Sequence, residues 1–154
     1  MEDKNVASSK MEKLGLAEET VGRLYEVYAE AIPEHESFWR GLALEEADHA
    51  RSVFELVDRA EDGEIEFQSE NVPDGYIDRF TGLLEELSKN TQDITFVKAL
   101  ENALEIEKTL AERRFYRSFG GGSPEVRAIL DYLDSSSESH VKAVELELER
   151  YKTG

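Results

Sequence analysis

The sequence predicts an all-α protein, and three observations support this class. Apolar residues recur with a period near 3.6 along most of the 154 residues, prolines number only three, and no long segment alternates between polar and apolar residues. The one candidate strand, EIEF at 64–67, is too short to change the class. Two short turns and one long middle connection indicate a four-helix bundle, in which two antiparallel helical hairpins are joined by a long crossover containing an extra short helix.

Capping residues set the expected helix boundaries. Gly63 ends the second helix, and Asp93 is the expected N-cap of the fourth. Ser123 caps the fifth, with Pro124 at its first helical position. The predicted helices cover about 9–32, 34–59, 74–88, 93–119 and 124–151. We therefore expect a single bundle domain over 9–153, with a crossover over 60–92 and a flexible N-terminus over 1–8.

Charge and composition exclude several classes of function. There are 35 acidic and 18 basic residues, which give a formal net charge of −17, so the surface would repel nucleic acid and acidic membranes. The chain has no cysteine, which excludes disulfides and thiolate-ligated metal sites. No apolar run resembles a secretion signal or a membrane span. We expect a cytoplasmic protein that binds neither nucleic acid nor membrane.

Each of the four long helices carries an apolar seam that is interrupted by polar residues at one level. A buried carboxylate or imidazole is costly unless a partner compensates it, so aligned interruptions indicate a site. Carboxylates together with neutral imidazoles suit iron, manganese or zinc. The interrupting residues are Glu18 in the first helix, Glu46 and His49 in the second, Glu107 in the fourth, and Ser137 and His140 in the fifth.

The order of these residues resembles the ligand pattern of ferritin-like di-iron carboxylate proteins. That pattern has a glutamate on the first core helix, Glu-x-x-His on the second, a glutamate on the third and Glu-x-x-His on the last. With the stretches LYEVYAE, LALEEADHA and ENALEIEK, the chain is similar to the small rubrerythrin-related proteins that lack a rubredoxin domain.

The resemblance implies a ferritin-like bundle around two iron ions, with oxidase or peroxidase-type chemistry on oxygen or peroxide. Glu46 and Glu107 would bridge the ions and Glu18 would bind one of them terminally. His49 and His140 would be the nitrogen ligands. Because the chain has no rubredoxin-like cysteines, electrons would come from a separate donor.

One ligand of the family pattern is missing, because Ser137 stands where a glutamate is expected. The neighbouring Glu138 reaches inward only if the helix is locally distorted. Arg114 lies on the inward seam, where an arginine can neutralise carboxylates in place of a metal. The ion beside His140 is therefore expected to bind more weakly. Tyr25 is expected mainly in the core, close to the centre.

Three functional hypotheses remain open at this point. The first is an iron or iron–manganese enzyme that reacts with oxygen or peroxide. The second is a metal-binding protein without turnover, holding zinc or iron. The third is a metal-free helical bundle that acts as an interaction protein, supported by Ser137 and Arg114. The apolar face of the short helix at 74–88 also suggests a homodimer.

Overall fold

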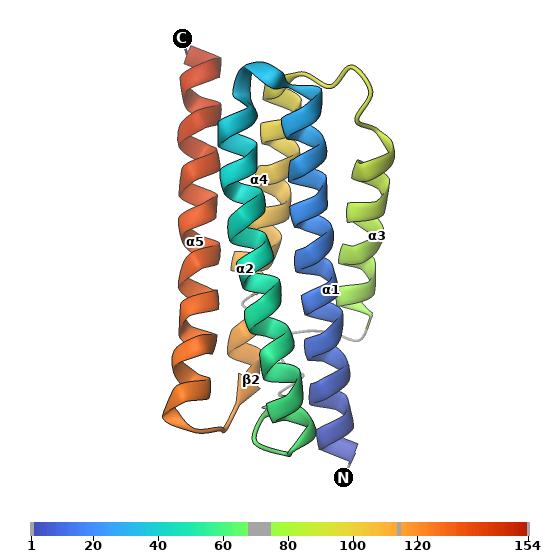
Figure 1. The fold of residues 1–154 in the computed structure, drawn as a ribbon, viewed down its shortest axis with the longest axis vertical. Helices are drawn as coiled ribbons and strands as arrows, with labels where there is room; N and C mark the ends of the chain where they lie inside the picture. The colour runs from blue at the N-terminus through green and yellow to red at the C-terminus, as the bar shows by residue number, and fades with distance from the viewer. Residues whose placement is uncertain (1, 68–74, 114, 154) are drawn as a thin grey trace.

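The protein is all-α, as predicted. The computed structural model describes residues 2–67, 75–113 and 115–153 (Figure 1). Two short 3-10 segments, η1 (Pro33–His35) and η3 (Phe115–Ser118), accompany the α-helices of these ranges. The helices are α1 (Glu2–Ala31), α2 (Glu36–Glu61), α3 (Tyr76–Lys89), α4 (Phe96–Arg113) and α5 (Pro124–Thr153).

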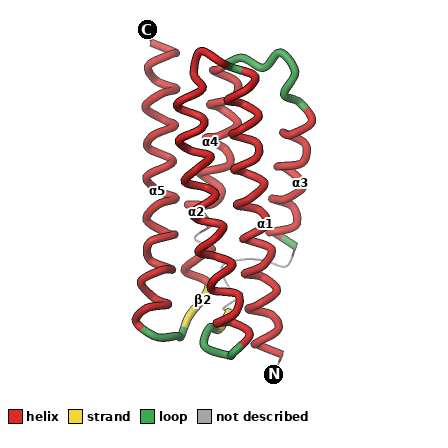
Figure 2. The backbone as a smooth tube through the Cα atoms, in the orientation of Figure 1, coloured by secondary structure: helices red, strands yellow, loops and turns green. Residues whose placement is uncertain are grey.

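The long helices lie side by side in a bundle (Figures 1 and 2). Helices α1 and α2 form one antiparallel hairpin, and α4 packs against α5 in a second. Helix α2 also contacts α5, while α3 packs on the outer side of α1 within the crossover between the hairpins. The two termini lie at opposite ends of the bundle. None of the described helices is long and apolar enough to cross a membrane.

The apolar seams form a continuous core above and below the level of the polar residues. At one end, Trp39 packs between Tyr25 and Tyr28, with ring centroids 5.5 Å and 4.9 Å away. These three aromatic side chains are fully buried and belong to α1 and α2. Burial of such large apolar surfaces stabilises the hairpin and keeps water away from its centre.

Helix α1 starts earlier than expected. The structure has helix from Glu2, whereas the sequence analysis placed the first helical residue near Ser9 and predicted a flexible segment over 1–8. The expected start of the helix is wrong because the apolar stripe continues for another turn: Ala7 is fully buried, four residues before Met11. Residue 1 lies outside the described residues.

Helix α4 is shorter than expected at both ends. Asp93 is not its N-cap: its φ is 57°, and Thr95 caps the helix instead, with Oγ1 accepting a 3.1 Å hydrogen bond from the Lys98 amide. The helix ends at Arg113, and the chain continues through η3 instead of remaining helical to the glycine run. By contrast, the predicted cap of α5 is confirmed, because Ser123 Oγ accepts a 3.3 Å hydrogen bond from the Val126 amide.

A short antiparallel pairing explains why α4 ends early. Strand β1 (Glu66–Phe67) pairs with β2 (Phe119–Gly120), so part of EIEF is a strand after all. Gly121 and Gly122 follow with φ of 79° and 84°, a conformation that favours glycine. The pairing joins the exit of the first hairpin to the turn of the second, and it directs η3 toward the centre of the bundle.

Candidate metal centre

The structure brings the five predicted ligands together in one buried layer. They come from four helices, and none is more than 3% exposed. The five are Glu18 from α1, Glu46 and His49 from α2, Glu107 from α4, and His140 from α5. The polar interruptions of the four seams are therefore at one level, as the sequence indicated.

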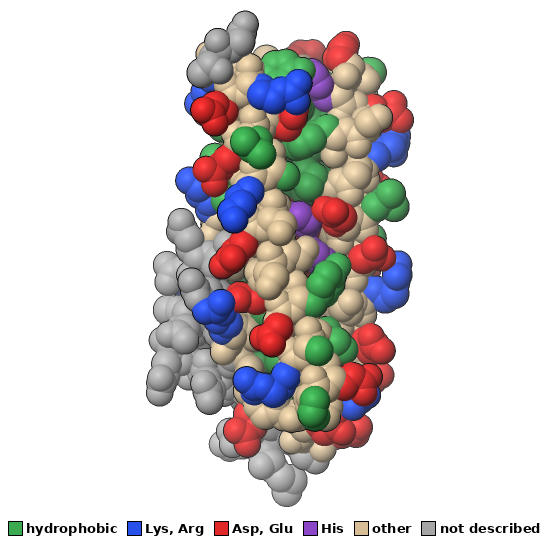
Figure 3. Space-filling view, turned by 90° about the vertical axis from the view of Figure 1, so that its left-hand side faces the viewer, with side chains coloured by type: hydrophobic (Ala, Val, Ile, Leu, Met, Phe, Trp, Pro, Cys, Tyr) green, Lys and Arg blue, Asp and Glu red, His purple; other side chains and the backbone are tan. Residues whose placement is uncertain are grey.

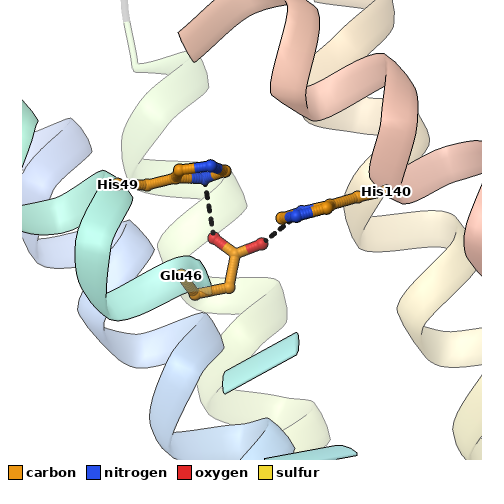
Figure 4. A group of neighbouring side chains, drawn as sticks. All are labelled: Glu46, His49 and His140. Atoms are coloured by element: carbon orange, nitrogen blue, oxygen red, sulfur yellow. Dashed lines mark hydrogen bonds and ion pairs between the residues drawn. The ribbon is translucent and has the colours of Figure 1, made fainter. Parts of the chain in front are cut away.

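Glu46 lies at the middle of this layer, between the two histidines (Figure 4). Its Oε1 is 2.9 Å from His140 Nδ1, and its Oε2 is 3.6 Å from His49 Nδ1. One ligand atom from each of Glu46, His49 and His140 lies within 4.8 Å of the other two, close enough to hold a metal ion. The spacing of three residues places Glu46 and His49 on the same face of α2.

Each histidine also faces a second carboxylate. His49 Nδ1 is 3.8 Å from Glu18 Oε2, and His140 Nδ1 is 3.5 Å from Glu107 Oε2. The layer is thus divided into two halves that share Glu46. The first half contains Glu18 and His49, and the second contains Glu107 and His140.

Two tyrosines hold the outer carboxylates in matching ways. The Tyr116 hydroxyl donates a 2.6 Å hydrogen bond to Glu18 Oε1, and the Tyr25 hydroxyl donates a 2.8 Å hydrogen bond to Glu107 Oε1. Burial raises the pKa of both phenols, and the negative charge of the bonded carboxylate raises it further. Both tyrosines therefore remain hydrogen-bond donors, and each leaves the second oxygen of its carboxylate facing the centre.

The outward nitrogens of the histidines are also fixed. His49 Nε2 lies 2.6 Å from Ser136 Oγ, and His140 Nε2 lies 2.7 Å from Glu45 Oε2. Metal-binding histidines commonly have such a partner on the ring nitrogen that does not bind the metal, because it sets the ring orientation. In both rings Nδ1 is the nitrogen that faces the buried glutamates of the layer.

The charges of the metal-free layer are unevenly distributed. Burial raises the pKa of Glu46 well above its ordinary value, and the charges of Glu107 and Glu18 add to this. Burial also acts to raise the pKa of Glu18, but hydrogen bonds from Glu46 and His49 and the charge of His49 outweigh it and lower the pKa to about 2. A proton is therefore held on Glu46, between two carboxylates.

The pKa of His140 is displaced as well. Burial acts to lower the pKa of its imidazole, but the hydrogen bond and charge of Glu107 and the carboxylate of Glu45 raise it above its ordinary value. Without a metal, protonation of Glu46 and His140 is therefore favoured, and it reduces the net negative charge of the layer.

Two buried oxygens indicate what the layer is suited to bind. Glu18 Oε2 and Glu46 Oε2 have no hydrogen-bond donor as long as both carboxyls are ionised. Among the described residues, the ion pairs of Glu18, Glu46 and Glu107 are all with the two histidines. A divalent cation would satisfy both oxygens and compensate the charge, and this donor set of oxygen and nitrogen suits iron, manganese or zinc.

Of the accessory residues from the sequence, Tyr25 contacts the layer through Glu107, whereas Ser137 and Glu138 supply no carboxylate to it. Ser137 is buried, but its hydroxyl donates a 3.2 Å hydrogen bond to the Leu133 carbonyl of its own helix. Helix α5 runs without a bulge through this region, and Glu138 is exposed, so the distortion that would turn it inward is not present. Arg114 lies outside the described residues.

Sequence reasoning missed three partners of the layer. Tyr116 belongs to η3, beyond the early end of α4, where the seam of that helix no longer applies. Glu45 and Ser136 flank seam residues and look like ordinary surface positions in the sequence. Glu45 is next to another glutamate and Ser136 lies between two other serines, so the sequence gives no signal that either of them contacts a histidine.

Comparisons with protein-family models, with curated proteins and with solved structures found no match to this chain. The geometry itself supports a buried glutamate–histidine cluster able to hold a metal ion. Its function has to be argued from that geometry.

Proposed function

We propose that the protein is a ferritin-like metalloprotein, similar to the small rubrerythrin-related proteins, that binds a pair of iron ions and reacts with oxygen or peroxide. The observation that carries the proposal is a buried layer of three carboxylates and two imidazoles, in which Glu18 Oε2 and Glu46 Oε2 have no hydrogen-bond donor as long as both carboxyls are ionised. Such a layer is more costly empty than filled by cations.

The two halves of the layer suggest the ligand sets. Glu18 and His49 would bind the first ion, and Glu107 and His140 the second. Glu46 would be shared, since its two oxygens face different histidines. The second half has one ligand fewer than the family pattern, because Ser137 bonds to its own backbone.

An iron pair, when bound, supplies electrons and Lewis acidity to oxygen or peroxide. The chain contributes the rest of the site. Tyr25 and Tyr116 orient the outer carboxylates, Ser136 and Glu45 orient the imidazoles, and the protons held by Glu46 and His140 leave when cations bind. The buried aromatic cluster of Tyr25, Tyr28 and Trp39 limits the access of water from one end of the bundle.

An anaerobic titration with ferrous iron tests the proposal. We expect about two ions per chain by elemental analysis, and oxidation of the bound iron by added peroxide faster than that of free iron at the same concentration. Glu18→Ala should lower the occupancy, whereas Glu19→Ala, a matched change on the exposed side of α1, should not. Protein that binds no iron would show that the proposal is wrong.

A second function, metal binding without turnover, is favoured by the position of Ser137. Its hydroxyl donates to the Leu133 carbonyl, so α5 supplies no carboxylate of its own beside His140, and that half has only Glu107 and the shared Glu46. If only the half with His49 is filled, one iron or zinc ion per chain would be found and peroxide would not be consumed. The same titration therefore distinguishes the two functions.

A further inference from the structure

A surface pocket opens on the outer side of the metal centre, between α2 and α5. Its volume is about 550 Å³. On the face of the molecule turned to the viewer in Figure 3, histidine atoms are visible at mid-height beside an acidic side chain. The pocket is lined by Glu45, Tyr132, Ser135, Ser136, Ser139, His140 and Ala143.

A single imidazole separates this pocket from the buried carboxylates. His140 is 3% exposed, and its Nε2 reaches Glu45 in the pocket wall at 2.7 Å while its Nδ1 reaches Glu46 at 2.9 Å. Ser136, also in the wall, contacts the outward nitrogen of His49 at 2.6 Å. Both histidines of the centre are thus in contact with residues of the pocket.

The chemistry of the lining favours a cation. The lining contains one carboxylate, three serine hydroxyls, a phenol and an imidazole, and none of the described residues that line it is lysine or arginine. The side chain of Glu45 is 59% exposed, so it can meet an ion from solvent while it contacts His140. Oxygen-rich donors of this kind can replace the hydration waters of a divalent cation.

Two other surface pockets have arginines in their lining. The groove between α1 and α2, of about 430 Å³, is lined by Arg23 and Arg51 as well as by Glu19 and Glu26. A pocket beside η3, of about 270 Å³, is lined by Arg117 and Arg127. Guanidinium groups repel cations, and neither pocket is lined by a histidine of the centre, so neither gives the same access as the serine-lined one.

We propose that the pocket between α2 and α5 is the port through which divalent cations reach the buried centre, with Glu45 as the first protein ligand. This inference rests on the proposed metal-binding function. The net charge of −17 attracts cations to the whole surface, and Glu45 captures them at the point where one side chain separates solvent from the ligands. The sequence SSSES on α5, which has no role at the centre beyond Ser136, then supplies the hydroxyls of the port.

Stopped-flow loading of the metal-free protein with cobalt(II), followed by its absorbance, tests the port. Ala143→Trp fills the pocket and should slow both loading and release by about tenfold, so that the equilibrium affinity changes little. Ala47→Trp, the same change in the groove between α1 and α2, should leave both rates unaltered. Circular dichroism of each variant checks that the bundle is intact.

A charge variant tests the role of Glu45 separately. Glu45→Gln should slow loading about fivefold, whereas Glu138→Gln, which removes an exposed charge from α5 outside the pocket, should change it less than about twofold. Equal effects of the two would mean that only long-range attraction acts, and would overturn the assignment of Glu45.

The remaining outcomes are distinct. If wild-type protein binds no cobalt, the proposed function fails together with the port. If wild type binds but Ala143→Trp loads and releases at the same rates, only the port is wrong. If loading is unchanged but preloaded Ala143→Trp protein consumes peroxide more slowly than wild type, the pocket admits the oxidant and not the cation.

Discussion

The two halves of the candidate centre have matching contacts but differ three residues before each histidine, where Glu46 precedes His49 and Ser137 precedes His140. In the first, His49 faces Glu18, and Tyr116 holds that carboxylate. In the second, His140 faces Glu107, and Tyr25 holds it in the same way. The difference is Ser137, which contributes nothing to its half because its hydroxyl bonds to Leu133. The tyrosine contacts are therefore the same in both halves, whereas the position of Ser137 supplies no carboxylate.

The hairpins that carry the halves also differ in how closely their helices approach. At Gly15 of α1, a Cβ atom would lie 2.7 Å from Phe54 Cε1 of α2, so the two helices meet where only glycine fits. At Gly22 a Cβ would have ordinary contact with the Ala43 carbonyl, 3.5 Å away. The first half is built on one tightly packed hairpin, whereas the second has a serine-lined pocket beside it. From this contrast we expect the half with His49 to bind metal with higher affinity than the half with His140.

The largest expected effect is that of removing His49. For wild type at a metal concentration one hundred times Kd, binding adds about 2.7 kcal/mol to the free energy of unfolding. His49→Ala should abolish most of this gain and His140→Ala should reduce it less. Thermal unfolding with and without ferrous iron, under anaerobic conditions, measures both. Equal losses in the two variants would mean that the halves do not differ.

Restoring the missing ligand should make the halves more alike. Ser137→Glu places a carboxylate three residues before His140, on the inward face of α5. Without metal the buried charge should destabilise the fold by about 1–3 kcal/mol, and with ferrous iron the rise in Tm should exceed that of wild type. Leu146→Glu, on the exposed side of α5 and outside the lining of the pocket, is the control. A variant with no added response to metal would contradict the assignment of this position.

The shared carboxylate should show itself in the pH dependence of the metal-free protein. Burial raises the pKa of Glu46, so above about pH 4.5 the folded protein keeps a proton that the unfolded chain has released, and stability falls as pH rises. Glu46→Gln cannot lose that proton. In chelator, it should gain on the order of 1 kcal/mol over wild type at pH 7.5 but not at pH 4. Urea unfolding at the two pH values measures the difference, and the same gain at both would contradict a proton on Glu46.

The two tyrosines should each affect one metal-binding step. Tyr116→Phe should weaken the tighter metal-binding step and Tyr25→Phe the weaker one, each by about tenfold, because the bonded carboxylate loses its fixed orientation. Calorimetric titration with cobalt(II) resolves the two steps. Tyr28→Phe is the control, since its hydroxyl accepts a hydrogen bond from Asn102 and does not contact the three glutamates. If Tyr116→Phe affected only the weaker step, the pairing of tyrosines with halves would be reversed.

The sequence predicted the all-α class and the buried layer of five polar residues because both follow from periodicity. Glu18, Glu46 and Glu107 each occupy a seam position, and the seams meet when the helices pack. Tyr116 was not predictable in this way. It depends on the end of α4 at Arg113, which follows from the pairing of Phe67 with Phe119, residues that are 52 positions apart in the chain. The periodic pattern of one helix cannot predict a contact between residues so far apart in the sequence.

Local signals failed where tertiary contacts decided the outcome. In the sequence Asp93 looks like the N-cap of α4. In the structure its backbone is left-handed, and Thr95 is the N-cap of this helix instead. Glu45 looks like a solvated neighbour of Glu46, yet it meets His140 because α5 packs beside α2. These contacts exist only after the two hairpins assemble.

The glycine pair after β2 has a consequence for which substitutions the chain can tolerate. At Gly122 a Cβ atom would lie 2.8 Å from Val126 Cγ1 and 3.3 Å from the Glu64 carbonyl, at a φ of 84°. Any side chain there would push β2 away from β1, and the displacement would pass through the neighbouring η3 to Tyr116 and so to Glu18. Gly122 contributes no side chain to the centre, yet it is therefore among the positions least tolerant of substitution. Evolutionary changes in β1 and in the segment from β2 to Gly122 should be correlated.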